Sequence, residues 1–476
     1  MSTTSSLASK RIQSLLDESS FVEIGALVSA RNTDFNLKQT ETPSDGVITG
    51  YGVIDGNLVY VYSQDVSVMN GSVGEMHAKK IANLYDLALK TGAPVIGLID
   101  SAGLRLQEAT DAMNAFGEIY LKQTMASGVI PQITAVFGNC GGGLAVIPTL
   151  TDFTFMEDKA KLFVNAPNAL DGNSTAKCDT ATADFQSKEV GIVDVTGDED
   201  TVLGKIRELV SLLPANNEDD ASYEDCTDDL NRVCADLANC VGDTSILLSN
   251  IADNSVFFEV KENYAKEMVT GFLKLNGVTV GAVANRTEVY GEDGNVAEKH
   301  DAVLTVAGCE KAAEFINFCD AFNIPVLSLT NVKGFEATVE SEKAISKAVA
   351  KLTYAFANAT VAKVNVVIGQ ALGSAYVAMN SKAIGADITI AWPDAEIGAM
   401  DSKLAAQIMY DGQGADVINE KAAEYAALQT SALSAAKRGY VDQIIEAADT
   451  RKYVIGAFEM LFTKREDRPS KKHGTV

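Results

Sequence analysis

The feature that most constrains this chain is an internal repeat, in which two glycine-containing motifs recur at a fixed offset of 231 residues. Residues 94–103 are echoed by residues 325–334, and residues 138–143 by residues 369–374. A period of this length is far longer than a solenoid unit, so it indicates two homologous domains. Each copy reads as apolar strand, glycine turn, helix, second strand, second glycine turn and helix. The sequence therefore predicts an α/β fold with two tandem domains, 1–240 and 241–476.

The charge and hydrophobicity of the chain exclude several classes of function. The 476 residues carry a net charge of −25, which argues against binding to nucleic acid or to anionic membrane surfaces. No uninterrupted run of about 18 apolar residues is present, so no membrane insertion is expected. The first six residues show no hydrophobic signal region. We therefore expect a soluble, cytoplasmic protein.

Local patterns place the elements between the repeated motifs. Strand, tight turn and strand patterns predict two hairpins, and continuous apolar runs predict buried strands. An acidic, polar segment predicts the linker between the domains, and the polar tail from Lys464 onward is expected to be frayed. The predicted hairpins are 50–62 and 271–283, the strands 95–99, 133–137 and 326–329, the helices 71–91, 204–213 and 309–322, and the linker 216–229.

The glycine turns are the best candidates for chemistry. Gly142 and Gly143 lack a Cβ atom, so a ligand can approach their main chain closely. Main-chain N–H groups at such a turn can hold an oxyanion, for example the enolate oxygen of a thioester. Tight packing of a helix against a strand also uses glycine, but packing alone needs no matched second turn at Gly373 and Ser374. A serine N–H can donate as a glycine N–H does.

Other kinds of site fit the sequence poorly. Only three histidines are present, and no spacing around His77 or His300 suggests a metal ligand or a nucleophile's base. Cys226, Cys234 and Cys240 match no metal-binding pattern, and Cys309 and Cys319 are typical of a core. No phosphate-binding loop or dinucleotide motif follows a strand. We therefore expect no metal site and a structural role for His77.

Several motifs, in order, resemble those of one family. The stretches 63–81, 100–108, 137–143 and 391–397 look like the signatures of biotin-dependent acyl-CoA carboxyltransferases, which include the β subunit of propionyl-CoA carboxylase and the carboxyltransferase subunit of methylmalonyl-CoA decarboxylase. The resemblance runs from about residue 8 to about residue 410. It implies two crotonase-like (ββα spiral) domains and a homo-oligomer, from dimer to hexamer, whose active sites lie where the first domain of one protomer faces the second domain of another.

The resemblance also implies the reaction and its residues. A carboxyl group moves between biotin on a carrier protein and a short-chain acyl-CoA, with biotin's own nitrogen as the base. One glycine turn steadies the enolate and the other the ureido oxygen of biotin. No biotin-attachment motif and no ATP-binding half are evident, so a biotin carboxyl carrier protein and a biotin carboxylase or membrane decarboxylase subunit are the implied partners. The implied catalytic residues are Gly142, Gly143, Gly373, Ser374 and Ala375, and the implied substrate-binding residues are Ala102, Gly103, Arg105, Gly334, Tyr376 and Val377.

The sequence departs from the family pattern at three places. The family's Pro-Gly-Phe-x-Pro-Gly loop is replaced by a different sequence at 332–338. The basic pair that precedes the second turn in the family is replaced by Gly369 and Gln370. Val377 stands at the position where the family's preference for the acyl chain is tuned. Residues 340–344 look more like glutaconyl-CoA decarboxylase subunits. The identity of the acyl-CoA substrate therefore stays open between propionyl- or methylmalonyl-CoA, acetyl- or malonyl-CoA, and glutaconyl-CoA. A biotin-independent hydratase or isomerase of the crotonase type is a further alternative, disfavoured because Asn165 and Met400 stand where glutamates would be needed. A non-catalytic scaffold is another.

Overall fold

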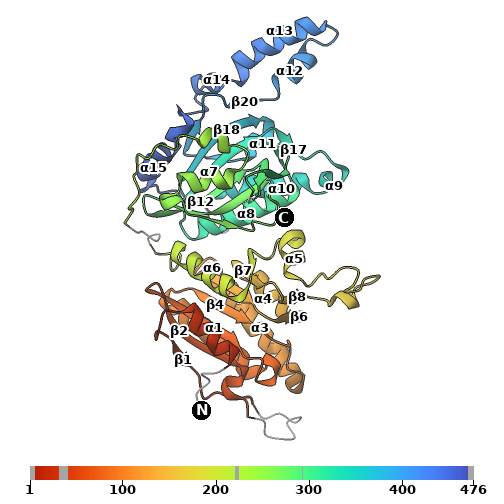
Figure 1. Ribbon diagram of the computed structural model, residues 1–476, viewed down its shortest axis with the longest axis vertical. Helices are drawn as coiled ribbons and strands as arrows, with labels where there is room; N and C mark the ends of the chain where they lie inside the picture. Colours follow the sequence, from red (N-terminus) through yellow and green to blue (C-terminus); the bar gives the residue numbers. More distant parts are fainter. Residues whose placement is uncertain (1–5, 32–40, 220–224, 292, 470–476) are drawn as a thin grey trace. The chain divides into compact units, whose positions relative to one another are not determined.

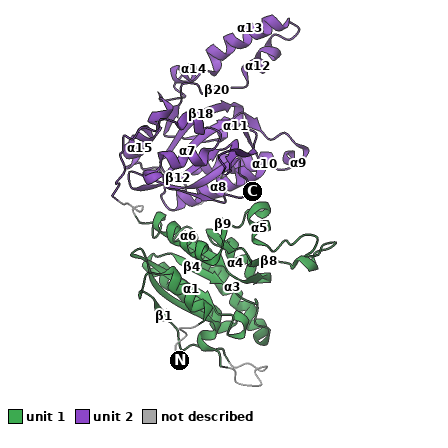
Figure 2. Cartoon of the chain, in the orientation of Figure 1, with its two compact units in different colours: residues 1–222 green, residues 223–476 purple. Residues whose placement is uncertain are grey.

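The computed structural model describes residues 6–31, 41–219, 225–291 and 293–469. The chain divides into two compact units, Met1–Ser222 and Tyr223–Val476, coloured separately in Figure 2. The division falls inside the acidic segment predicted to be the linker. Residues 225–240 belong to the second unit, where Leu237 is buried in the core and the Cys234 N–H donates to the Ala448 carbonyl oxygen. We therefore propose that the first domain ends before residue 225 rather than at residue 240.

A mixed sheet forms the centre of the first unit. Its described strands follow the order β1-β2-β3-β4-β5-β7-β9. The pairs β1–β2 and β2–β3 are antiparallel, and every later pair is parallel. The predicted hairpin is β2–β3, with Asp55 and Gly56 at its turn, both at positive φ as a tight two-residue turn requires. The strands are β1 Val22–Ile24, β2 Val47–Ile54, β3 Asn57–Gln64, β4 Val95–Ile99, β5 Gln132–Val136, β7 Phe153–Glu157 and β9 Val195–Gly197.

The second unit repeats this order of seven described strands, and its sheet carries an eighth, β20 Glu396–Gly398, which pairs in parallel with β18. Its order is β10-β11-β12-β16-β18-β19-β21, with two antiparallel pairs followed by parallel pairs, counted over the described residues. The predicted duplication of an α/β domain is therefore confirmed. The strands are β10 Phe257–Val260, β11 Met268–Leu275, β12 Val278–Asn285, β16 Val326–Val332, β18 Lys363–Leu372, β19 Ile388–Ala391 and β21 Gln443–Ile444.

Helices cover the sheets in the same way in both units (Figure 1). In the first unit α2 and α3 pack together over the sheet, and their core takes Tyr60 and Tyr62 from β3. Val59 and Val61, which alternate with these tyrosines along β3, are also buried. Because side chains alternate along a strand, the two valines point to the other face, which α1 and α6 cover. The helices are α1 Leu7–Leu15, α2 Glu75–Thr91, α3 Ala109–Ala126, α4 Val146–Leu150, α5 Ala183–Phe185 and α6 Glu199–Leu212.

In the second unit α8 and α10 take the place of α2 and α3. Cys309 and Cys319 of α8 are buried, which confirms their assignment to a core. The helices α12 and α13 extend away from the sheet of this unit (Figure 1). The helices are α7 Thr244–Ile251, α8 Val306–Ala321, α9 Val339–Glu342, α10 Ile345–Asn358, α11 Gly373–Ala378, α12 Ser402–Met409, α13 Ala415–Tyr425, α14 Ala432–Lys437 and α15 Thr450–Leu461.

The side-chain hydrogen bonds that hold the two sheets are duplicated as well. Asp17 accepts the N–H groups of Asp55 and Gly56 at the first hairpin turn, and Asp253 accepts those of the equivalent Asn276 and Gly277. Each aspartate is in turn bonded by an arginine, Arg207 at 2.8 Å and Arg451 at 2.6 Å. The repeat therefore preserves polar interactions far apart in the sequence as well as the apolar pattern.

Two buried lysines form another duplicated pair at the offset of 231. Lys80 Nζ donates to the carbonyl oxygens of Ser44 and Val47, and Lys311 Nζ to those of Lys261 and Tyr264. Burial lowers the pKa of Lys80 to about 8 and that of Lys311 to about 7, because removal from water disfavours an ammonium. Both lysines fasten the first long helix of their unit to main-chain carbonyls.

Two glycines allow two segments of the chain to pass very close to each other. Gly138 follows β5 and lies against the residue after β4, and Gly369, near the end of β18, lies against the end of β16. A Cβ at Gly138 would lie 1.9 Å from Asp100 Oδ1, and one at Gly369 would lie 2.5 Å from Asn331 Oδ1. The two contacts are equivalent under the repeat. In each unit, the chain at the end of β4 or β16 can therefore lie directly against the chain that leads into the glycine turn. This is possible only because the glycine at that point carries no side chain.

One expectation about the tail is wrong. Residues from Lys464 to Arg468 are held against the second unit rather than frayed. Lys464 Nζ donates to Asp387 Oδ2 at 2.8 Å, and Arg468 donates to the Ala357 carbonyl oxygen. The polar composition suggested solvation, but these cations find partly buried acceptors. The rest of the predicted frayed tail, 470–476, lies outside the described residues.

The close approach at the two glycines generates a stability prediction. Gly369→Ala or Gly138→Ala should each lower the free energy of unfolding by roughly 1–3 kcal/mol, because the added methyl group must displace a side-chain oxygen. Thermal unfolding by calorimetry measures this effect. The control is Gly204→Ala in helix α6, where a Cβ meets no atom within 4 Å and alanine should stabilise by about 0.5–1 kcal/mol. Equal melting temperatures for all three variants would contradict the steric argument.

Candidate functional site

In the first unit the turn after β4 lies beside the glycine turn after β5. The Ser101 N–H donates to the Asn139 carbonyl oxygen at 3.0 Å. Gly103 has φ of +90°, and a Cβ there would lie 3.7 Å from the Gly141 carbonyl oxygen. Ala102 is exposed. The structure thus brings Ala102 and Gly103, predicted for substrate binding, next to the predicted catalytic Gly142 and Gly143.

The two glycine turns have the same conformation. Gly142 and Gly373 each have φ of +63°, and the residues that follow them, Gly143 and Ser374, are both exposed. Helical structure begins at each first glycine, as a 3₁₀ turn at Gly142–Ala145 and as α11 in the second unit. Because the first N–H groups of a helix have no partner within it, each turn offers main-chain donors at the surface.

Tyr120 supports the first turn and carried no signal in the sequence. It lies on α3, and its hydroxyl donates to the Gly143 carbonyl oxygen. Fixing that carbonyl also fixes the plane of the following peptide group and therefore the direction of its N–H. Tyr120 lies 23 residues before Gly143, so only the packing of α3 beside the turn reveals the contact.

A chain of buried hydrogen bonds holds the base of this site. The Asp100 N–H donates to Gln64 Oε1 at 3.2 Å, and the Gln64 amide lies 3.2 Å from His77 Nε2. His77 Nδ1 lies 3.0 Å from the Asp45 carbonyl oxygen. Because a carbonyl only accepts, Nδ1 carries the proton, and Nε2 accepts from the Gln64 amide. The structural role expected for His77 matches this position.

Burial keeps the His77 ring neutral. The side chain is fully buried, and desolvation, reinforced by the positive charge of Arg105, lowers its pKa to about 3. A second ring proton would face the Gln64 amide donor in the chain of bonds described above. His77 therefore sets the shape of the turn and does not exchange protons near neutral pH.

Arg105 is bonded entirely within the first unit. Its side chain is 1% exposed and pairs with Asp45 at 2.6 Å and Glu108 at 2.9 Å. The remaining donors reach the hydroxyl and carbonyl oxygens of Ser72. These contacts occupy the guanidinium. They therefore favour a structural role, in which Arg105 holds the turn after β4, rather than direct contact with a substrate.

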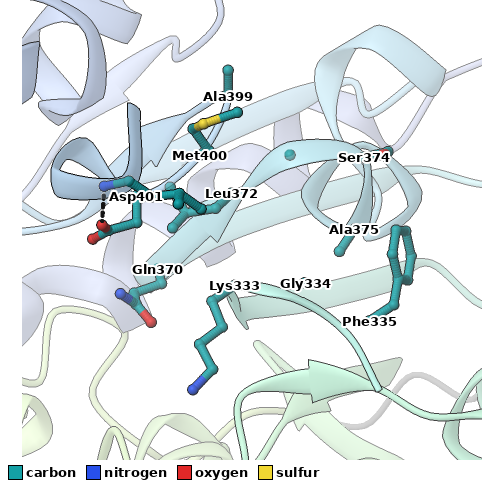
Figure 3. A pocket seen from close by; sticks show the side chains of 12 residues that line it. Lys333, Gly334, Phe335, Gln370, Leu372, Ser374, Ala375, Ala399, Met400 and Asp401 are labelled. Carbon is teal, nitrogen blue, oxygen red and sulfur yellow. Dashed lines mark hydrogen bonds between the residues drawn. The ribbon is translucent and has the colours of Figure 1, made fainter. Parts of the chain in front are cut away.

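In the second unit a pocket of about 390 Å³ opens beside the second glycine turn (Figure 3). Four of the residues expected from the sequence line it: Gly334, Gly373, Ser374 and Ala375. The other eight lining residues were not among the expected site residues, and they come from the turn after β16 and the short strand β17 Gly334–Phe335, from the end of β18, and from the loop into α12 and the helix itself. They are Lys333, Phe335, Gln370, Leu372, Ala399, Met400, Asp401 and Leu404.

Tyr376 and Val377 continue α11 beyond the residues that line this pocket. Tyr376 is half-buried against a small apolar cluster that includes Val367 and Ile397, and burial raises its pKa to about 12. Val377 is 38% exposed. Their contact with a substrate stays a prediction.

No group of three or more histidine, cysteine, aspartate or glutamate residues within the described part of the chain is arranged to hold a metal ion. All seven cysteines are free thiols. No helix in the described ranges has the length and apolar character needed to cross a membrane.

Comparison with known proteins gives matches over nearly the whole chain. The family model for the carboxyl transferase domain matches residues 2–476. The methylmalonyl-CoA decarboxylase subunit alpha of Propionigenium modestum is 38% identical over 488 residues, covering 98% of this chain and 92% of the relative. The propionyl-CoA carboxylase beta chain of Roseobacter denitrificans is 38% identical, with 98% and 93% covered. The crystal structure of transcarboxylase 12S, a hexamer with hydrolysed methylmalonyl-coenzyme A bound, superposes with a TM-score of 0.92 at 37% identity, covering 98% and 92%.

The buried histidine generates a prediction about acid stability. The folded protein holds His77 neutral down to about pH 3, whereas the unfolded chain takes up the proton near pH 6.5. Because of His77, the free energy of unfolding of the wild-type protein should therefore fall by up to about 1.4 kcal/mol for each pH unit as pH drops from 6.5 towards 3. In His77→Gln this loss is absent, so the stability gap between the two proteins should narrow with acid. Chemical denaturation at pH 7, 6 and 5 measures the gap, and a constant gap would contradict the neutral ring.

Proposed function

Because the chain belongs to the carboxyl transferase family and is an acyl-CoA carboxyltransferase, we propose that it moves a carboxyl group between biotin on a carrier protein and a short-chain acyl-CoA. The observation that carries this proposal is the pair of glycine turns, matched in φ, in exposure and in position within the repeat. A transfer between two reactants that each develop a negative oxygen calls for two sets of donors, one for each.

The chemistry of the turns follows from their main chain. When the carboxyl group leaves the acyl-CoA, the electron pair of the breaking carbon–carbon bond stays on the α-carbon and is shared with the thioester oxygen. The N–H groups at one turn would stabilise that oxygen, and those at the other would stabilise the ureido oxygen of biotin. The carboxyl group would pass to a ring nitrogen that bound biotin would supply, and the proton of that nitrogen would pass to the α-carbon.

The relatives favour propionyl-CoA and methylmalonyl-CoA as the pair of reactants. These two thioesters appear in the names of the relatives, and methylmalonyl-coenzyme A is bound in the transcarboxylase structures. We propose this pair first, with acetyl-CoA and malonyl-CoA, and then glutaconyl-CoA, as alternatives. Both directions, carboxylation and decarboxylation, use the same site, because a catalyst stabilises one transition state for the two directions.

The same reasoning assigns partners to the chain. A biotin carboxyl carrier protein would deliver the biotin, and a biotin carboxylase or a membrane decarboxylase subunit would charge or discharge it. The hexameric assembly of transcarboxylase 12S supports a homo-oligomer of this chain, from dimer to hexamer.

A decarboxylation assay tests the proposed function directly. The purified protein is incubated with biotin or biocytin and with malonyl-, methylmalonyl- or glutaconyl-CoA, and loss of the carboxyl group is followed. Loss that depends on biotin, with one of the three preferred, is the expected result and identifies the substrate. Hydration of crotonyl-CoA without biotin would instead indicate a hydratase, and inactivity on every substrate in the presence of the biotinylated carrier would indicate a scaffold.

The first glycine turn gives a sharp substitution. Gly143→Val places a branched side chain over the exposed main chain, so transfer should fall by at least about 10²–10³-fold while the oligomer stays intact. Ser374→Gly is the matched control at the equivalent position of the second turn, because it keeps the N–H group and should stay within a few-fold of wild type. Steady-state rates and size-exclusion chromatography measure both properties, and a near-normal rate for Gly143→Val would refute the role of the turn.

Tyr120→Phe tests how much the turn depends on its support. Removal of the hydroxyl frees the Gly143 carbonyl oxygen, and kcat should fall roughly 5- to 10-fold with little change in KM, because the substrate's ground-state contacts are kept. A rise in KM without a change in kcat would show that Tyr120 contacts the substrate instead.

A further inference from the structure

A lysine distinguishes the turn that follows β16 in the second unit from the equivalent turn that follows β4 in the first unit. Lys333 directly follows β16 and is equivalent under the repeat to Ala102 in the first unit. Both positions are exposed, but only the second carries a charge, and Lys333 lines the pocket at the second glycine turn. Building on the proposed function, we propose that Lys333 binds the carboxylate that is transferred, and so selects carboxylated reactants over their decarboxylated forms.

The main chain at Lys333 is held firmly, so the side chain starts from a fixed point. The Lys333 N–H donates to the Ala302 carbonyl oxygen at 2.8 Å. The next residues pair in parallel with a short strand, β15 Val303–Leu304, through β17 Gly334–Phe335. From there the side chain extends to the same side as that of Gln370, which comes from the end of β18 (Figure 3).

The ammonium of Lys333 is only loosely balanced by the protein. Its ion pair joins Nζ to Asp301 Oδ1 at 3.6 Å, and the Asp301 side chain is 81% exposed. Such a pair contributes little, because water solvates both partners. Gln370 is polar but uncharged, and its amide nitrogen lies 3.3 Å from Glu396 Oε2. A carboxylate on a reactant can therefore replace Asp301 at small cost.

The pocket also contains a carboxylate of its own, but that group already has a partner. Asp401 Oδ1 accepts the Leu404 N–H at 2.9 Å and caps helix α12. Apolar side chains, those of Phe335, Leu372 and Met400, make up much of the remaining wall. A reactant that fills the pocket displaces water from beside Lys333, and the attraction between the ammonium and a bound carboxylate strengthens as water leaves.

The expected effect is on binding. The carboxylate is present in the reactant before transfer and in the product after it, so an ammonium that pairs with it stabilises both bound states. Lys333 keeps its proton throughout, and the bonds that break and form are those of the transfer described above. Loss of the lysine should therefore raise KM for the carboxylated reactant more than it lowers kcat.

The test compares two coenzyme A thioesters that differ only in the carboxylate. The full-length protein, wild type and Lys333→Met, is titrated calorimetrically with methylmalonyl-CoA and with propionyl-CoA, and KM and kcat are measured in the biotin-dependent assay. Lys333→Met should lower the ratio of the two affinities by about 10-fold or more, and Lys333→Arg should restore most of it. The charge-matched control is Lys347→Met, at an exposed lysine of α10, which should leave the ratio unchanged.

The carboxylate can reach the pocket from either reactant, and the measurements separate the two sources. An altered affinity ratio means that the acyl-CoA brings it. An unaltered ratio, with a KM for the carboxylated biotin carrier raised about 10-fold or more, means that biotin brings it. If both quantities stay within twofold of wild type, the assignment of Lys333 is overturned while the proposed function stands. If the wild-type protein transfers no carboxyl group, the proposed function falls, and this inference falls with it.

Discussion

The arrangement of both candidate turns depends on the close crossing of two chain segments at Gly138 and Gly369. At each glycine a polar side-chain atom from the preceding turn, of Asp100 or Asn331, occupies the space where a Cβ would stand. Because this contact needs the absence of a side chain, it fixes the residue type at both positions. It also fixes the distance between the turn after the first central strand and the turn after the second, and so the place at which main-chain donors reach the surface.

A second set of interactions makes this crossing rigid. Gln64 and Asn285, at the ends of equivalent strands, accept the N–H groups of Asp100 and Asn331 at 3.2 and 3.0 Å. In the first unit Gln64 continues into the buried His77, whereas in the second unit Asn285 contacts the sulfur atoms of Met268 and Met379. The acceptor that positions the turn is kept in both copies, while the residues behind it have diverged.

The differences between the copies make the two turns chemically unequal. Gly143 is replaced by Ser374, which keeps the N–H group, and Ala102 by Lys333, which adds a charge. The first turn is braced by Tyr120, at a position equivalent to Lys351, whose ammonium pairs instead with Glu310. One scaffold thus presents two turns with the same main-chain conformation and different surroundings.

The sequence by itself determined the duplication, the α/β class, both hairpins, the buried strands and the family. These follow from the offset of 231 residues, from local hydrophobic patterns and from motifs in order, none of which depends on long-range contacts. The predicted turns could also be located, because glycine at a strand end has a local signature.

Only the tertiary structure decided which side chains surround those turns. The pairing of Arg105 with Asp45, the support of Gly143 by Tyr120 and the tether of Lys464 to Asp387 each join residues that are remote in the sequence. They lie 60, 23 and 77 positions apart, respectively. Local patterns cannot reveal such contacts, because they arise when separate elements pack. The same holds for Lys333. In the sequence it was noticeable only as part of a departure from a motif, and the tertiary structure shows that it lines a pocket.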